Sequence, residues 1–136
     1  MIADPSVERT LTDLDHARLE RLLRDADDAA AEPLEQLLAT AAVVPSRDVA
    51  ADVVTMNSEV LIEADGTAAP MKLAIRYPSD ADPTKGAVSV LAPAGASILG
   101  SRVGASVCWS GADGRLQRRR IKALLYQPER SGDYLR

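Results

Sequence analysis

The segment from Val88 to Trp109 constrains the fold more than any other stretch of this chain. It begins with a short apolar run, Val88 to Leu91, which has the length of a buried strand. Pro93 ends strand pairing because it has no backbone N–H to donate, and Gly95 permits a sharp turn. One helical turn follows, closed by Gly100, and then a second extended apolar run. The segment predicts a strand, an elbow, a short helix and a strand, which must pack on a larger sheet.

Three further segments alternate between apolar and polar residues, which is typical of half-buried strands. They cover residues 60–64, 71–77 and 118–126. We therefore predict one twisted, mainly antiparallel sheet over residues 52–126 that covers the short helix. Residues 127–136 are predicted to be a tail.

The first 47 residues have a helical pattern instead. Leucines and alanines recur at helical spacing from Leu11 to Ala26 and from Leu34 to Ala42, with a proline before the second helix and another after it. About 12 residues per helix give an arm of roughly 18 Å. The sequence predicts an α+β protein, with an antiparallel helical hairpin over residues 1–47 and a sheet domain over residues 48–136.

Acidic residues gather where the two predicted helices meet: Asp25, Asp27, Asp28 and Glu32. Carboxylates are good magnesium ligands, but a solvated loop explains the same residues, and the short arm favours the loop. His16 on the first helix has no second histidine to join it and is predicted to be a surface side chain. No spacing typical of a metal site, a phosphate-binding loop or a nucleophile–base pair occurs elsewhere, so we predict no cofactor and no catalytic residue.

Charge is divided unevenly along the chain. Residues 1–57 carry 12 acidic and 5 basic side chains, whereas residues 58–136 carry 8 and 11. An acidic first part joined to a mildly basic second part bears on partners rather than on fold. The single cysteine, Cys108, rules out an internal disulfide and suits a reducing compartment. No leader and no membrane span of roughly 20 apolar residues is predicted, so we expect a cytoplasmic protein.

The last predicted strand carries a basic run. Strict alternation places Arg118, Arg120, Lys122 and Leu124 on one face, and Arg119, Ile121, Ala123 and Leu125 on the other. The first face would meet an acidic partner or nucleic acid phosphate. An exposed sheet face or edge guarded by charge against aggregation explains the same pattern. Both interpretations stay open at this point.

Ordered blocks of residues carry a family resemblance. They are Asp80 to Val90, Pro93, Gly95, Ile98-Leu99-Gly100, Val103-Gly104, the run DVVTMNS at 52–58, and YQPE with GDY within 126–134. The blocks between Asp80 and Gly104 resemble the C-terminal domain of the bacterial Gre transcript cleavage factors. The last two are similar to a short-armed branch of that family, the regulators of nucleoside diphosphate kinase. The helical hairpin fits the family by position and size.

The resemblance implies an FKBP-like sheet domain that docks at the rim of the RNA polymerase secondary channel. Gre factors grip this rim partly through the elbow, so the implied contact residues are Ala92, Pro93, Ala94, Gly95, Ile98, Leu99 and Gly100. Ala92 stands where the family has a serine, which removes one hydroxyl contact. The longer Gre coiled coil brings its acidic tip to the catalytic magnesium, whereas an arm of roughly 18 Å stops short.

The resemblance therefore implies a non-enzymatic regulator that occupies the channel, competes with Gre-type factors and does not stimulate cleavage. It would meet nucleic acid only through the polymerase, and its effect on nucleoside diphosphate kinase levels would be indirect. Two alternatives remain: a cleavage factor that uses the acidic tip, and a peptidyl-prolyl isomerase. The second needs an aromatic pocket, for which the chain offers few aromatic residues, and fold alone does not carry function.

Overall fold

Five strands form the main sheet, in the order β5-β4-β3-β7-β6. The computed structural model describes residues 9–25, 31–64, 70–111 and 114–132. The strands are β3 (Glu59–Ala64), β4 (Met71–Arg76), β5 (Ala87–Ser89), β6 (Ser106–Ser110) and β7 (Leu116–Tyr126). All neighbouring pairs are antiparallel except β4 and β5. The mainly antiparallel sheet and the α+β class are confirmed.

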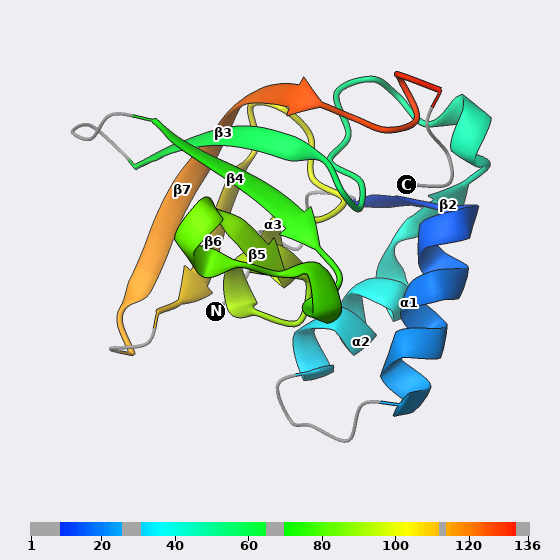
Figure 1. The fold of residues 1–136 in the computed structure, drawn as a ribbon, viewed down its shortest axis with the longest axis horizontal. Helices are drawn as coiled ribbons and strands as arrows, with labels where there is room; N and C mark the ends of the chain where they lie inside the picture. The colour runs from blue at the N-terminus through cyan, green and yellow to red at the C-terminus, as the bar shows by residue number, and fades with distance from the viewer. Residues whose placement is uncertain (1–8, 26–30, 65–69, 112–113, 133–136) are drawn as a thin grey trace.

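The sheet curls around a short helix, α3 (Pro93–Ile98), which packs against β5 and β6. Two longer helices, α1 (Asp13–Asp25) and α2 (Glu32–Thr40), lie together to one side of the sheet (Figure 1). Between β5 and β6 the chain follows the predicted elbow, helix and turn, and Gly100 has a φ of 83°. That left-handed conformation suits glycine because it has no Cβ.

The last strand departs from strict alternation because it contains two bulges. Ile121 pairs with Ile62 but Ala123 pairs with Leu61, so Lys122 is an extra residue, and Leu125 is a second one. A bulge shifts the side chains that follow it to the opposite face. Leu124 therefore packs against the core, whereas Leu125 is 47% exposed. The prediction that Leu125 shares the face of the buried Ile121, opposite Leu124, is wrong.

The base of the two helices is a pair of short parallel strands, β1 (Thr10–Thr12) and β2 (Ala42–Val44). The second helix was expected to continue to Ala42, but α2 ends at Thr40. The backbone N–H of Ala42 instead donates to the carbonyl of Arg9 at 2.9 Å. Strand pairing with a distant segment therefore overrides the helical spacing of the alanines.

One hydrophobic core runs through both predicted parts of the chain. Leu19 of α1 and Leu34 and Leu37 of α2 are buried in the same cluster as Val60 and Ile121 of the sheet. The leucines recur at helical spacing, so each helix turns one apolar stripe inward. The helices are thus packed on the sheet domain through their apolar faces.

The chain after β7 begins with a buried residue. The side-chain nitrogen of Gln127 donates to the carbonyls of Ala50 at 2.9 Å and Val53 at 2.7 Å, and its oxygen accepts from the N–H of Arg130. Thr55 donates to the carboxylate of Glu129 at 2.7 Å. Residues 127–130 are therefore tied to the domain, and the prediction of a tail is wrong for them.

The shared core predicts a single unfolding transition. Leu37→Ala should lower the free energy of unfolding by about 2–5 kcal/mol, because it leaves a cavity where helix and sheet meet. Helical circular dichroism and the fluorescence of Trp109 on β6 should shift together during thermal melting. Leu14→Ala, at a partly exposed position on α1, is the control and should shift both signals much less. Loss of helix at a temperature that leaves the Trp109 signal unchanged would contradict the shared core.

Candidate functional site

The elbow before α3 is a tightly packed turn at the surface. The N–H of Ala92 donates to the carbonyl of Ser89 at 3.0 Å, which turns the chain back after β5. Pro93 then opens α3, where its missing N–H costs no helical hydrogen bond. Gly95 packs so closely that a Cβ there would overlap the carbonyl oxygen of Ser89. Only glycine fits at position 95, and this close packing against Ser89 holds the elbow rigid.

The structure divides the predicted contact residues into two groups. Pro93 is exposed, with Ala92 and Ala94 half-buried beside it. The other four are buried: Gly95, Ile98, Leu99 and Gly100. Only the first group offers surface to a partner, and the second group forms the base on which the elbow stands.

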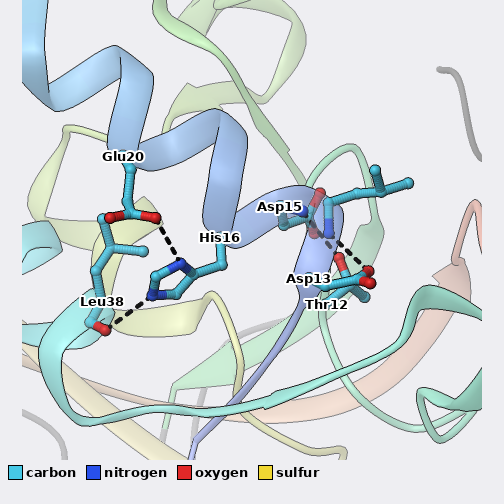
Figure 2. Close-up of polar contacts among 7 residues, drawn as sticks. Thr12, Asp13, Asp15, His16, Glu20 and Leu38 are labelled. Carbon is cyan, nitrogen blue, oxygen red and sulfur yellow. Dashed lines mark hydrogen bonds and ion pairs between the residues drawn. The ribbon is translucent and has the colours of Figure 1, made fainter.

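A polar joint attaches α1 to the sheet domain. Thr12 caps the helix, since its Oγ1 accepts from the N–H of Asp15 at 3.0 Å. Oδ2 of Asp15 in turn accepts from the N–H of Met56 at 3.0 Å. Asp13 accepts from both the N–H and the hydroxyl of Ser46. Figure 2 shows Thr12, Asp13 and Asp15 gathered at this end of α1.

Burial dominates the electrostatics of the joint. Desolvation raises the pKa of Asp15 to about 6, and the Glu129 carboxylate adds to this effect, while the Met56 N–H and the Arg18 charge oppose it. Burial also raises the pKa of nearby Tyr77 to about 12. The exposed carboxyl of Asp13 behaves in the opposite way, because the Ser46 hydroxyl lowers its pKa. In the sequence, Asp15 is one of two acidic residues in the first turn of α1, and its residue type gives no sign that it is buried.

His16 joins the two helices and is not the surface side chain that was predicted. Its Nδ1 lies 3.1 Å from the Glu20 carboxylate, and its Nε2 lies 3.1 Å from the carbonyl of Leu38 on α2. Figure 2 shows the ring held between these two acceptors. The imidazole is half-buried because α2 packs over it. A lone histidine gives no signal in sequence for such an interhelical contact.

The predicted acidic tip is described only in part. Asp25 ends α1 and Glu32 begins α2, and both are exposed. Asp27 and Asp28 lie outside the described residues. Within the described ranges, no group of three or more histidine, cysteine or acidic residues is placed to hold a metal ion.

The basic face on β7 is exposed and partly neutralised. Arg120 and Lys122 share one carboxylate, that of Glu63, at 3.5 Å and 4.0 Å. Arg118 is exposed, and the described parts of the chain give its side chain no ion pair. Arg119 points to the other face, with its guanidinium 5.9 Å from the Trp109 ring. Because β7 lies inside the sheet, the edge-guard interpretation does not apply, and an exposed charged face remains.

A groove of about 430 Å³ lies between β3, β4, β5 and the loop that joins β4 to β5. Its charged residues are three cations and three carboxylates: Lys72, Arg76 and Lys85, with Glu59, Asp80 and Asp82. Glu59 pairs with Lys72 at 3.1 Å. The balance of charge gives this groove no preference for an anion or a cation.

No helix in the described residues is long and apolar enough to cross a membrane.

The raised pKa of Asp15 predicts a pH dependence of stability. A folded pKa of about 6, against 3.8 for the free group, means that the folded state binds the proton more tightly. This contribution is complete below pH 3.8 and is lost as pH rises through 6. Asp15→Asn keeps an acceptor for Met56 without a charge, so it should be more stable than the wild type at pH 8 by roughly 1–3 kcal/mol, and equal to it near pH 4. Urea unfolding at the two pH values measures the difference.

Asp13→Asn is the matched control for that experiment. Because the pKa of Asp13 is lowered, its contribution is present at neutral pH and lost as pH falls, which is the opposite sign. Asp15→Ala, which leaves the Met56 N–H without its acceptor, should be less stable than Asp15→Asn at both pH values. Parallel pH profiles for the wild type and Asp15→Asn would show that Asp15 is not held as described.

Comparisons with known proteins agree on one family. The family model for the C-terminal part of the GreA/GreB transcription elongation factors matches residues 49–126. The regulator of nucleoside diphosphate kinase from Escherichia coli K12 is 42% identical over 86 residues, and the protein of that name from Shigella flexneri gives the same figures. The aligned part is 62% of this chain and 62% of each relative. The chain thus matches less than two thirds of the length of these relatives.

Solved structures extend the match beyond the sheet domain. A GreA/GreB elongation factor from Nitrosomonas europaea has a TM-score of 0.75 and 34% identity, covering 88% of this chain and 98% of that one. The transcription factor Gfh1 has a TM-score of 0.51 at 20% identity over 88% of this chain and 98% of its own, and so shows the fold alone. The family match covers more than half of the chain, and the resemblance seen in residues 52–134 is confirmed. The chain belongs to the GreA/GreB family of transcription elongation factors.

Proposed function

We propose that this protein is a non-enzymatic transcription regulator that binds RNA polymerase at the rim of the secondary channel. It occupies the place of Gre-type factors and competes with them without stimulating transcript cleavage. The observation that carries the proposal is the elbow: an exposed Pro93 on a rigid turn, in a chain of the GreA/GreB family. The FKBP-like arrangement of the sheet and the antiparallel hairpin of α1 and α2 belong to the same proposal.

The length and packing of the helices support occupancy without cleavage. With 13 residues, α1 is about 20 Å long. Its apolar face is buried in the core through Leu19, and α2 is held in the same way through Leu34 and Leu37. Asp25 and Glu32 therefore lie no farther from the sheet domain than these short helices reach, which is short of a distant catalytic magnesium. No cofactor is required for this function.

The surface around Pro93 determines the chemical character of the contact with RNA polymerase. Ala92 and Ala94 flank the proline with small apolar side chains, so the contact is apolar and lacks the serine hydroxyl of the Gre elbow. The basic face of Arg118, Arg120 and Lys122 supplies a second contact with acidic polymerase surface. Nucleic acid lies near the protein only through the polymerase.

The relatives named as regulators of nucleoside diphosphate kinase suggest a physiological output. A channel-binding protein alters which transcripts are completed when it displaces Gre-type factors. We therefore propose that the level of this kinase changes through transcription, with no contact between the two proteins.

Competition for core polymerase tests the proposal. A fluorescent Gre factor bound to core enzyme should be displaced as this protein is added, and Gre-dependent cleavage should fall in parallel. Pro93→Ala should weaken displacement roughly tenfold, because it removes the ring from the contact while alanine keeps the helix. Pro78→Ala changes another exposed proline that opens a short helical turn, and should have no effect. Unchanged cleavage at saturating protein would overturn competition, and cleavage by the protein alone would restore the acidic-tip alternative.

A further inference from the structure

We infer that Arg9 is a positioning residue for the docking elbow: it holds the carboxyl end of α3, while Pro93 at the amino end meets the polymerase. The inference rests on the proposed function, since it concerns how that same surface is kept in place. It assigns a role in binding to a residue far from the elbow in sequence.

The Arg9 guanidinium reaches the end of α3. Its Nη1 lies 2.7 Å from the carbonyl oxygen of Ala96, 3.1 Å from that of Ser97 and 3.3 Å from that of Leu99. The last carbonyls of a helix have no partner within the helix, and a positive charge is favourable beside them. One side chain therefore serves a cluster of carbonyls in a helix of only six residues.

The other carbonyls at this end are satisfied locally. The N–H of Leu99 donates to Gly95 at 3.0 Å, and the N–H of Ser101 donates to Ile98 at 3.1 Å. Among the described residues, Arg9 is the partner that remains for the carbonyl of Ala96. Burial removes water from part of the guanidinium, which lowers the pKa of Arg9, and the hydrogen bonds to these carbonyls offset the cost of that desolvation. The contact is therefore an internal cap and not a surface ion pair.

The backbone around Arg9 fixes the guanidinium relative to the rest of the protein. The N–H of Thr10 donates to the carbonyl of Gly100 at 3.0 Å, and the carbonyl of Arg9 accepts from Ala42 at 2.9 Å. A Cβ on Gly100 would lie 3.0 Å from the Thr10 oxygen and 3.3 Å from the Cβ of Arg9. The chain at residues 9–10 thus lies in close contact with the turn after α3, and it continues through β1 into α1.

These contacts restrain α3 at both of its ends. Its amino end is set by the turn at Ser89 and by the tight packing of Gly95. Its carboxyl end is held by Arg9 and by the backbone of Gly100, whose N–H donates to the carbonyl of Val54 at 2.8 Å. Without Arg9, the carbonyl of Ala96 loses its partner and α3 is held less firmly, so Pro93 shifts from the orientation in which the partner meets it.

Two substitutions of Arg9 in the full chain test this role in the competition assay. Arg9→Met keeps the apolar stem but has no donors, and should require about tenfold more protein for displacement. Arg9→Lys keeps a charge and can reach part of the carbonyl cluster, so it should recover part of the affinity. Amide resonances of Ala92 and Ala94 should move in Arg9→Met and return toward wild-type positions in Arg9→Lys.

Two controls separate positioning from general stability. Arg102→Met removes an exposed arginine that pairs with Asp52 at 3.2 Å, and should leave displacement unchanged. Ile62→Val loosens the core on β3 and lowers the melting temperature, and it leaves the hydrogen bonds of Arg9 to α3 in place. If Arg9 only stabilised the fold, Arg9→Met and Ile62→Val would change affinity alike.

The outcomes distinguish the inference from the proposed function. Wild-type displacement that Pro93→Ala weakens and Arg9→Met does not would overturn the role of Arg9 and leave the docking site standing. A wild-type protein that displaces nothing would refute the proposed function instead. In that case the resonances of Ala92 and Ala94 decide the positioning role alone, and their failure to move in Arg9→Met would overturn it.

Discussion

Burial of the N-terminal leucines in the core of the sheet is the constraint on which the rest of this structure depends. Leu19, Leu34 and Leu37 are removed from water only because the strands supply an apolar surface for them. Once the helices are held there, the polar groups at their base must find partners inside the protein. Asp15 therefore accepts from Met56, and Arg9 donates to the end of α3.

In the function proposed above, a longer projecting coiled coil would carry its carboxylates far from the domain that binds the polymerase. Here the helices are short and their apolar faces are already covered, so they add to the body of the protein instead. In the function proposed above, the elbow retains the means to bind while the arm lacks the reach to act on a transcript.

Much of the sheet and of the elbow could be predicted from the sequence, because both depend on local rules. Alternation identified β3, β4 and β7, and Pro93 with Gly95 identified the turn before α3. The bulges at Lys122 and Leu125 could not be predicted, since they arise from pairing with β3 and leave no mark on the alternation of β7 itself. The same is true of the end of α2, where Ala42 pairs with β1.

The polar residues of the candidate site were harder to predict than its backbone. Asp15 fits the first turn of any helix, and its burial depends on Met56, 41 residues away. Arg9 reaches carbonyls about 90 positions along the chain, and Gln127 is buried only because residues 50–53 pass beside it. Contacts of this kind are set by the folded arrangement, so the residue types alone carry no signal for them.

Native-state hydrogen exchange tests the central claim, that helices and sheet form one body, most directly. The informative amides are those of Thr10 and Met56, which donate across the joint between the two parts, to the carbonyl of Gly100 and to the carboxylate of Asp15. If the core is shared, these amides should exchange only through global unfolding, with opening free energies within about 1 kcal/mol of those in β3 and β7. Exchange through openings that cost several kcal/mol less would show that the helices detach from an intact sheet, which would contradict the account.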